Sequence, residues 1–251
     1  MNGLYENIIN DGVIQGRASG LDSGMYNGLY HDTGNIKPSP VIRNLALFLD
    51  TTNFNSASIP PVIWRDLNLT NDAICTNVLY SSSDRGYVFD GTSYCVSSNT
   101  STIVGVGAVV TVEAVISLAT SSKCVVFTVG QTGAGFNYGM ILQGNSLYSR
   151  NTTSEVALGT AQVTLNQWTH VTIVYNSTGS KGYINGVLVG SNSQTTTYPG
   201  SNPFYAIGQR ASNSTVERFN GKIKMIRVQR TELTDDEVYR NYLSAKANYK
   251  L

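Results

Sequence analysis

Charged residues are scarce in this sequence. Asp, Glu, Lys and Arg make up 13% of the 251 residues, about half of the roughly 25% that is usual in soluble domains. The formal net charge is +1, so no overall electrostatic field favours nucleic acid or an anionic membrane. Ser, Thr, Asn and Gly replace the charged residues, a composition that favours turns and polar strand faces over helices.

Cysteine is also rare. The three cysteines, Cys75, Cys95 and Cys124, are too few and too widely spaced for a disulfide scaffold or a zinc site. We expect reduced thiols that act as small buried hydrophobes, and the sequence leaves open whether one pair forms.

Export and membrane signals are missing. The N-terminus has no basic segment followed by an apolar one, and no run approaches the roughly 18 apolar residues of a membrane span. We therefore expect a protein made in a cytoplasm and not exported by a standard signal. On this interpretation the Asn-x-Ser/Thr triplets, such as Asn99-Thr100-Ser101, are chance occurrences rather than glycosylation sites.

Residues 1–41 differ from the rest of the chain. Glycines recur at roughly four-residue intervals with tyrosines between them, and the segment ends in Lys37-Pro38-Ser39-Pro40, which favours extended backbone. No helical or strand period persists. Two arrangements fit: an extended N-terminal arm that orders on a neighbouring subunit, or short extra strands along the main domain.

Strand signals dominate residues 42–251. The clearest lie in Trp168–Tyr175 and in the two short runs that flank Asn185-Gly186, a dipeptide that favours a tight hairpin. We expect Trp168 to be the large apolar anchor of this meander, Gly86–Asp90 and Tyr94–Ser97 to form a hairpin, and residues 68–75 to be a loop. The remaining expected strands are Leu45–Leu49, Val62–Leu67, Val109–Leu118, Lys123–Val129, Tyr138–Leu142, Ser146–Arg150, Glu155–Leu158, Phe204–Ile207 and Gly221–Val228.

One helix is predicted at residues 234–247. Thr234 and Glu237 form a capping box, and acidic residues follow Thr234 where the helix dipole favours them. Val238, Tyr242 and Ala245 give an apolar stripe at helical spacing. Together the patterns predict an all-β sandwich or barrel with one C-terminal helix.

A basic cluster precedes this helix. It is followed at once by acidic residues, so we interpret it as a solvated face rather than a nucleic-acid site. Its members are Lys222, Lys224, Arg227 and Arg230.

The order of segments after residue 45 resembles the concanavalin A-like, laminin-G-like jelly-roll family, and within it the versions found in phage and other virus particle proteins. The matching pieces are Leu47–Asp50, Trp64–Leu67, Val88–Tyr94, Thr111–Ile116, Trp168–Val171, Tyr183–Gly186, Ile207–Gly208, Phe219–Ile223 and Arg227–Tyr242. The resemblance implies a two-sheet antiparallel jelly-roll sandwich over residues 42–251, with residues 1–41 as an extended arm.

The resemblance also implies a function. We expect a non-enzymatic structural protein of a virus particle (a phage capsid decoration, minor capsid or tail accessory protein), anchored to other virion proteins through residues 1–41. The alternative is a lectin that recognises host or environmental glycans. Neither role implies nucleic acid or membrane as a partner, and an oligomer is compatible with both.

Hydrolysis finds little support in the sequence. Glycosidases need two carboxyls about 5–9.5 Å apart, and hydrolytic relatives place them at alternate positions of one strand. The best-placed acid is Glu113, whose expected neighbours on the same face are Thr111 and Val115. We therefore interpret Glu113 as structural.

Other catalytic patterns are equally weak. His31 lies in the N-terminal segment and His170 in a strand, and no nucleophile elbow or phosphate-binding loop is present. The glycines of 130–135 follow a strand without a helix signal and are expected to form a turn. We therefore predict no catalytic residues and no enzyme activity.

Ligand positions are not specified by any motif. Glycan binding would use exposed aromatic side chains, with candidates Tyr138, Tyr148 and Tyr198. We predict no resident cofactor; the family allows calcium, but the ion needs about six to eight oxygen ligands, and the loop acids form no dense motif. Those acids are Asp50, Asp66, Asp72, Asp84 and Asp90.

Overall fold

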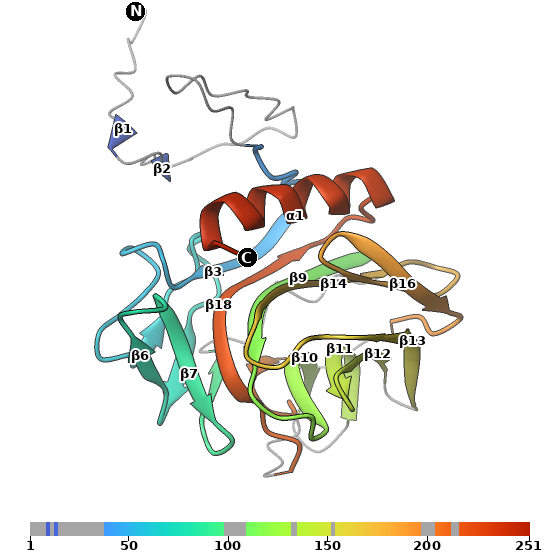
Figure 1. The fold of residues 1–251 in the computed structure, drawn as a ribbon, viewed down its shortest axis with the longest axis horizontal. Coiled ribbons are helices and arrows are strands. Elements are labelled where there is room, and N and C mark those ends of the chain that lie inside the picture. The colour runs from blue at the N-terminus through green and yellow to red at the C-terminus, as the bar shows by residue number, and fades with distance from the viewer. Residues whose placement is uncertain are drawn as a thin grey trace, which may run out of the picture.

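A computed structural model describes most of the chain after residue 37 (Figure 1). The described residues are 9–10, 13–14, 38–97, 109–131, 135–151, 154–196, 204–211 and 216–251. The predictions for most of residues 1–41, for His31 and for Tyr198 lie outside them. Within the N-terminal segment, β1 (Ile9–Asn10) and β2 (Val13–Ile14) pair antiparallel.

Two antiparallel sheets form a β-sandwich, as the sequence predicts. The first, here called the helix-covered sheet, comprises β3 (Leu45–Asp50), β6 (Leu79–Ser81), β7 (Gly86–Asp90), β9 (Val110–Leu118), β14 (Trp168–Tyr175), β15 (Ser180–Ile184), β16 (Val187–Asn192) and β18 (Asn220–Gln229). Its order is β16-β15-β14-β9-β18-β7-β6. One edge of β18 pairs with β7 at its start and with β3 at its end.

The second sheet, here called the opposite sheet, comprises β4 (Ile63–Trp64), β5 (Ala73–Thr76), β8 (Tyr94–Ser97), β10 (Cys124–Gln131), β11 (Gly135–Gln143), β12 (Ser146–Arg150), β13 (Glu155–Gln162) and β17 (Phe204–Ile207). Its order is β13-β12-β11-β10-β17-β8-β5-β4. The predicted meanders β11-β12-β13 and β14-β15-β16 are therefore confirmed.

The expected hairpin of Gly86–Asp90 and Tyr94–Ser97 is wrong. β7 pairs with β18 and β6 in the helix-covered sheet, whereas β8 pairs with β17 and β5 in the opposite sheet. The turn between them is held by the Asp90 carboxylate, which accepts hydrogen bonds from the backbone N–H groups of Thr92 and Ser93. A turn of this length can either reverse a strand or lead the chain across to the other sheet, and local sequence does not distinguish the two.

The core lies between the sheets and is one continuous cluster. Trp64 is completely buried there, with its ring 4.8 Å from that of Tyr87 in an edge-to-face arrangement. Trp168 is only half-buried and packs under α1, so its prediction as the main apolar anchor is wrong. Because side chains alternate along β14, Trp168 shares the outer face with His170, while Val171 faces the core.

The predicted helix is confirmed. α1 (Asp235–Tyr249) begins after Thr234, whose hydroxyl accepts a hydrogen bond from the Glu237 backbone while the Glu237 carboxylate accepts one from the Thr234 backbone. Val238 and Ala245 are buried against the outer face of the helix-covered sheet, over which α1 lies in Figure 1. No helix among the described residues is long and apolar enough to span a membrane.

Two of the three cysteines form a disulfide, which corrects the expectation of reduced thiols. Cys75 on β5 lies directly opposite Cys95 on β8, and their sulfurs are bonded. Cys124 is a buried free thiol, as expected. The pair forms because the strand register brings the two residues together, and their separation in sequence contains no sign of that register.

Candidate functional site

A buried polar cluster lies between α1 and the helix-covered sheet. The carboxylate of Glu113 is fully buried and accepts hydrogen bonds from Arg227 Nε at 2.8 Å, Gln229 Nε2 at 3.2 Å and Asn241 Nδ2 at 3.0 Å. His170 Nε2 lies 3.4 Å from Glu113 Oε1, and neither of its ring nitrogens makes a hydrogen bond. We call these five residues the Glu113 cluster.

The Glu113 carboxylate and the Arg227 guanidinium form a close ion pair, so their charges cancel inside the Glu113 cluster. Burial alone would raise the pKa of Glu113, but the charge of Arg227 and the contacts with His170 outweigh it and hold the pKa well below its usual range. Burial alone would lower the pKa of Arg227, but the charge of Glu113 raises it. The pair is therefore ionised inside the protein, where a lone charge would be unfavourable.

The prediction of a solvated basic face is wrong for its central members. Arg227 is 3% exposed, and Lys224 is 6% exposed, with its Nζ donating to the backbone oxygen of Tyr249 at 2.9 Å. Lys222, in a partly exposed pair with Asp84, and Arg230, which is exposed, behave as predicted. The reason is α1, which covers the outer face of β18 and so encloses side chains that would otherwise be in water.

The Glu113 cluster also holds the chain where residues 1–41 enter the domain. Asn241 accepts a hydrogen bond from the Val41 backbone N–H at 2.6 Å and donates to the Val41 carbonyl. The Arg43 backbone N–H donates to Gln229 Oε1 at 2.6 Å, and the Arg43 guanidinium pairs with Glu237 on α1. The N-terminal segment is thus attached to α1 at its root.

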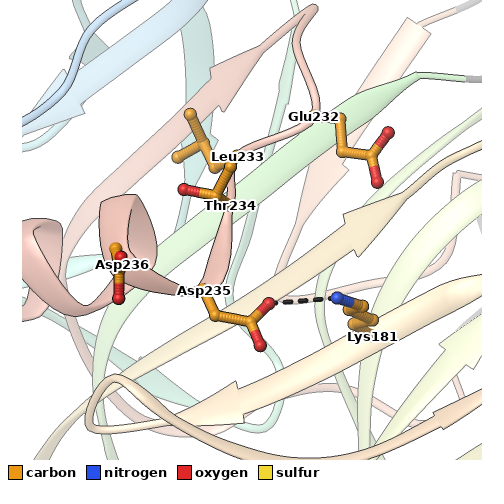
Figure 2. Close-up of a pocket in the computed structure, with 6 residues that line it drawn as sticks. All are labelled: Lys181, Glu232, Leu233, Thr234, Asp235 and Asp236. Carbon is orange, nitrogen blue, oxygen red and sulfur yellow. Dashed lines mark hydrogen bonds and ion pairs between the residues drawn. The ribbon is translucent and has the colours of Figure 1, made fainter.

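A shallow, open depression of about 500 Å³ lies at the start of α1. Figure 2 shows the Asp235 carboxylate pointing at Lys181 on β15, 3.0 Å from its Nζ, and Asp235 also accepts a hydrogen bond from Tyr183 at 2.8 Å. The carboxylates of Glu232 and Asp236 point in other directions (Figure 2). These contacts fasten the helix to β15 and do not converge on a ligand.

The outer face of the opposite sheet has a second charged group, here called the cation network. It comprises Lys123, which precedes β10, Arg150 at the end of β12, Glu155 at the start of β13, and Arg210 and Glu217 from the connection between β17 and β18. Lys123 Nζ lies 2.5 Å from Glu155 Oε2 and 2.8 Å from Glu217 Oε1. Arg150 pairs with Glu155, and Arg210 Nε donates to Glu217 Oε2 at 2.5 Å.

The cation network is partly open to solvent. The three basic side chains are 16–31% exposed and the two carboxylates 12% and 14%. Burial, and after it the charge of Arg210, lowers the pKa of Arg150. Its five members come from four separate stretches of the chain without a shared motif, so no sequence signal could have identified them.

The tyrosine candidates separate by face. Tyr138 is 3% exposed and belongs to the core, where burial raises its pKa, so it cannot meet a ligand. Tyr148 is half-buried and lies on the outer face of β12, because its neighbour Leu147 faces the core. Of the two described candidates, only Tyr148 is placed to contact a glycan.

The loop acids stabilise turns instead of forming a metal centre. Asp66 is 1% exposed and accepts hydrogen bonds from the backbone of Phe48 and Asn68, and burial raises its pKa. Asp50 accepts a hydrogen bond from Tyr249 at 3.0 Å. In the described part of the chain, no three His, Cys, Asp or Glu side chains are grouped so that they could hold a metal ion.

A comparison with protein family models shows to which family the chain belongs. A laminin G family model, described as the concanavalin A-like lectin/glucanases superfamily, matches residues 89–239, which is more than half of the sequence. The chain therefore belongs to the concanavalin A-like lectin/glucanases superfamily. A comparison with curated protein sequences finds no match.

Solved structures share the fold at low sequence identity. A sialidase of Trypanosoma rangeli matches with a TM-score of 0.60 and 14% identity over 82% of this chain and 33% of the sialidase chain. Domain 4 of AbnA, a GH43 extracellular arabinanase from Geobacillus stearothermophilus solved in complex with arabinotriose, matches with a TM-score of 0.59 and 19% identity. That match covers 79% of this chain and 98% of the arabinanase domain, whereas this chain spans about a third of the sialidase.

Proposed function

We propose that this protein is a carbohydrate-binding module that binds glycans without cleaving them. The observation that carries the proposal is the match to domain 4 of the arabinanase, which covers 98% of a separate domain solved with arabinotriose. The sialidase match involves a third of a longer chain, which also fits a domain that accompanies catalysis rather than one that performs it.

The absence of hydrolysis is part of the proposal. Glu113, the acid best placed on its strand, is sealed beneath α1 and bonded to Arg227, so a sugar cannot reach it. Asp235 is engaged by Lys181 and Tyr183. Most glycoside hydrolases place two carboxyls on either side of the scissile bond, and neither Glu113 nor Asp235 is available for that role.

The experiment is a binding screen of the full chain against neutral and acidic oligosaccharides, with arabinotriose included and with reducing-end release measured in parallel. We expect retention of at least one glycan without release of reducing ends. Failure to bind any glycan, with and without calcium, would contradict the proposal. Release of reducing ends by the purified wild-type chain that is abolished in a Glu113→Gln variant shown to be folded would contradict the non-enzymatic part.

Attachment to a virus particle through residues 1–41 stays a prediction. The observation compatible with it is the root of this segment, where Val41 and Arg43 are fastened to α1 and the Glu113 cluster. Purified particles would carry the full chain and not a chain that begins at residue 42, if the segment is the anchor. Equal incorporation of both chains would contradict it.

A further inference from the structure

The cation network has more positive than negative charge. Lys123, Arg150 and Arg210 share two carboxylates, those of Glu155 and Glu217. Burial lowers the pKa of Arg150, and the nearby charge of Arg210 lowers it further. One more negative charge at this place would relieve that repulsion.

A fourth cation extends the same face. Arg218 follows Glu217, donates to the Thr92 carbonyl, and lies with its guanidinium 4.6 Å from the centre of the Tyr94 ring. Tyr94 is on the outer face of β8 because its neighbour Cys95 is in the core. Arg218 makes no ion pair with a carboxylate among the described residues.

The internal segments outside the described residues carry no carboxylate that could balance the extra cation. They contain no Asp, Glu, Lys or Arg at all; they are 98–108, 132–134, 152–153, 197–203 and 212–215. Among the described residues, the cation network therefore holds three cations and two carboxylates.

The residue before Arg210 in the chain carries a buried amide without a hydrogen-bond partner. Gln209, next to Arg210, is 0% exposed, and neither its side-chain oxygen nor its nitrogen makes a hydrogen bond. Its backbone carbonyl accepts a hydrogen bond from Thr128 on β10, so this turn crosses the outer face of the opposite sheet. A buried amide without a partner is unfavourable.

We propose that the outer face of the opposite sheet binds the acidic group of an anionic glycan at the cation network. The planar guanidinium groups of Arg150 and Arg210 match the two oxygens of a sugar carboxylate or sulfate. Lys123 adds a flexible third donor, and half-buried Tyr148 borders the ligand on β12. The proposal rests on the proposed carbohydrate binding and specifies its substrate class.

The test compares acidic oligosaccharides with neutral ones. Binding of 3′-sialyllactose and of tetragalacturonate to the full chain is measured by calorimetry beside lactose and arabinotriose. We expect the acidic sugars to bind at least about tenfold more tightly, because hydrogen bonds to charged groups exceed neutral ones. The preference should shrink as salt rises from about 0.02 M to about 0.3 M.

Variants assign the preference to the network. Arg210→Gln and Lys123→Gln should each reduce binding of acidic sugars by at least about tenfold and leave neutral sugars unchanged. The control is Lys181→Gln, which removes a more exposed ion pair on the helix-covered sheet and should change neither. If a variant fails to fold, the same comparison is made with wild-type protein and a tetragalacturonate whose carboxyls are converted to neutral amides.

The results of these measurements separate failure of the anionic-glycan inference from failure of the proposed carbohydrate binding. Equal binding of acidic and neutral sugars overturns this inference and leaves the proposed function intact. Binding of no sugar overturns both. Inorganic sulfate that binds as tightly as the acidic sugars, with the same loss in Arg210→Gln, shows a simple anion site and also overturns the inference. Sulfated and carboxylated galactans compared side by side identify which acidic group the site prefers.

Discussion

Replacing Glu113 by Gln is predicted to destabilise the fold severely. The substitution keeps the size of the side chain and leaves Arg227, 3% exposed, without a counter-charge beneath α1. Breaking a buried ion pair by removing one partner costs about 3–5 kcal/mol. For a domain of this size, each kcal/mol corresponds to about 2–4 °C in Tm, so we expect Tm to fall by roughly 6–20 °C.

The assay is thermal unfolding at neutral pH, checked by urea titration. A double variant, Glu113→Leu with Arg227→Met, removes both charges and should recover most of the loss, since a buried pair contributes little beyond an apolar replacement. The matched control is Asp84→Asn, which breaks the partly exposed pair with Lys222 and should cost less than about 1 kcal/mol. A loss below about 1 kcal/mol in Glu113→Gln would refute the reasoning.

Three further predictions concern stability. Because the folded pKa of Glu113 lies below its usual value of 4.5, the stability difference between wild type and Glu113→Gln should be constant above about pH 5.5 and shrink as pH falls below 4.5; a difference that grows on acidification would contradict this. Cys75→Ser should lower the free energy of unfolding by about 3 kcal/mol, since the disulfide closes a loop with a separation of 20 residues; equal Tm values for wild type with and without reductant would count against it. Gly159→Ala should cost at least about 2 kcal/mol, because its φ is +104° and a Cβ would overlap the Val189 carbonyl; Gly144→Ala, with φ +56° and open space, is the control at about 1 kcal/mol.

The local elements were predictable because their causes are local. Thr234 and Glu237 lie within one turn, so the capping box identified the start of α1. Asn185 and Gly186 adopt positive φ values, as their hairpin requires. Strand alternation placed Glu113 on the face that carries Val115, now seen under α1.

Errors arose where a residue's environment depends on a distant segment. Tyr94–Ser97 has the pattern of a hairpin strand, but its partners are β5 and β17. Arg227 is charged, so the sequence predicts that it is solvated. It is buried because α1 packs over β18. Trp168 and Trp64 are equally apolar, and the sheet face on which each lies decides which one forms the core.

The sequence by itself determined that this chain is a β-sandwich with one C-terminal helix, since periodicity, turn residues and caps act within a few residues. Tertiary structure determined which cysteine, charged and polar side chains meet. It joined Cys75 to Cys95, enclosed Glu113 with Arg227, and assembled Lys123, Arg150 and Arg210 on one face. These groups come from strands and connections far apart in the chain, and their charges interact only over the short distances that folding creates.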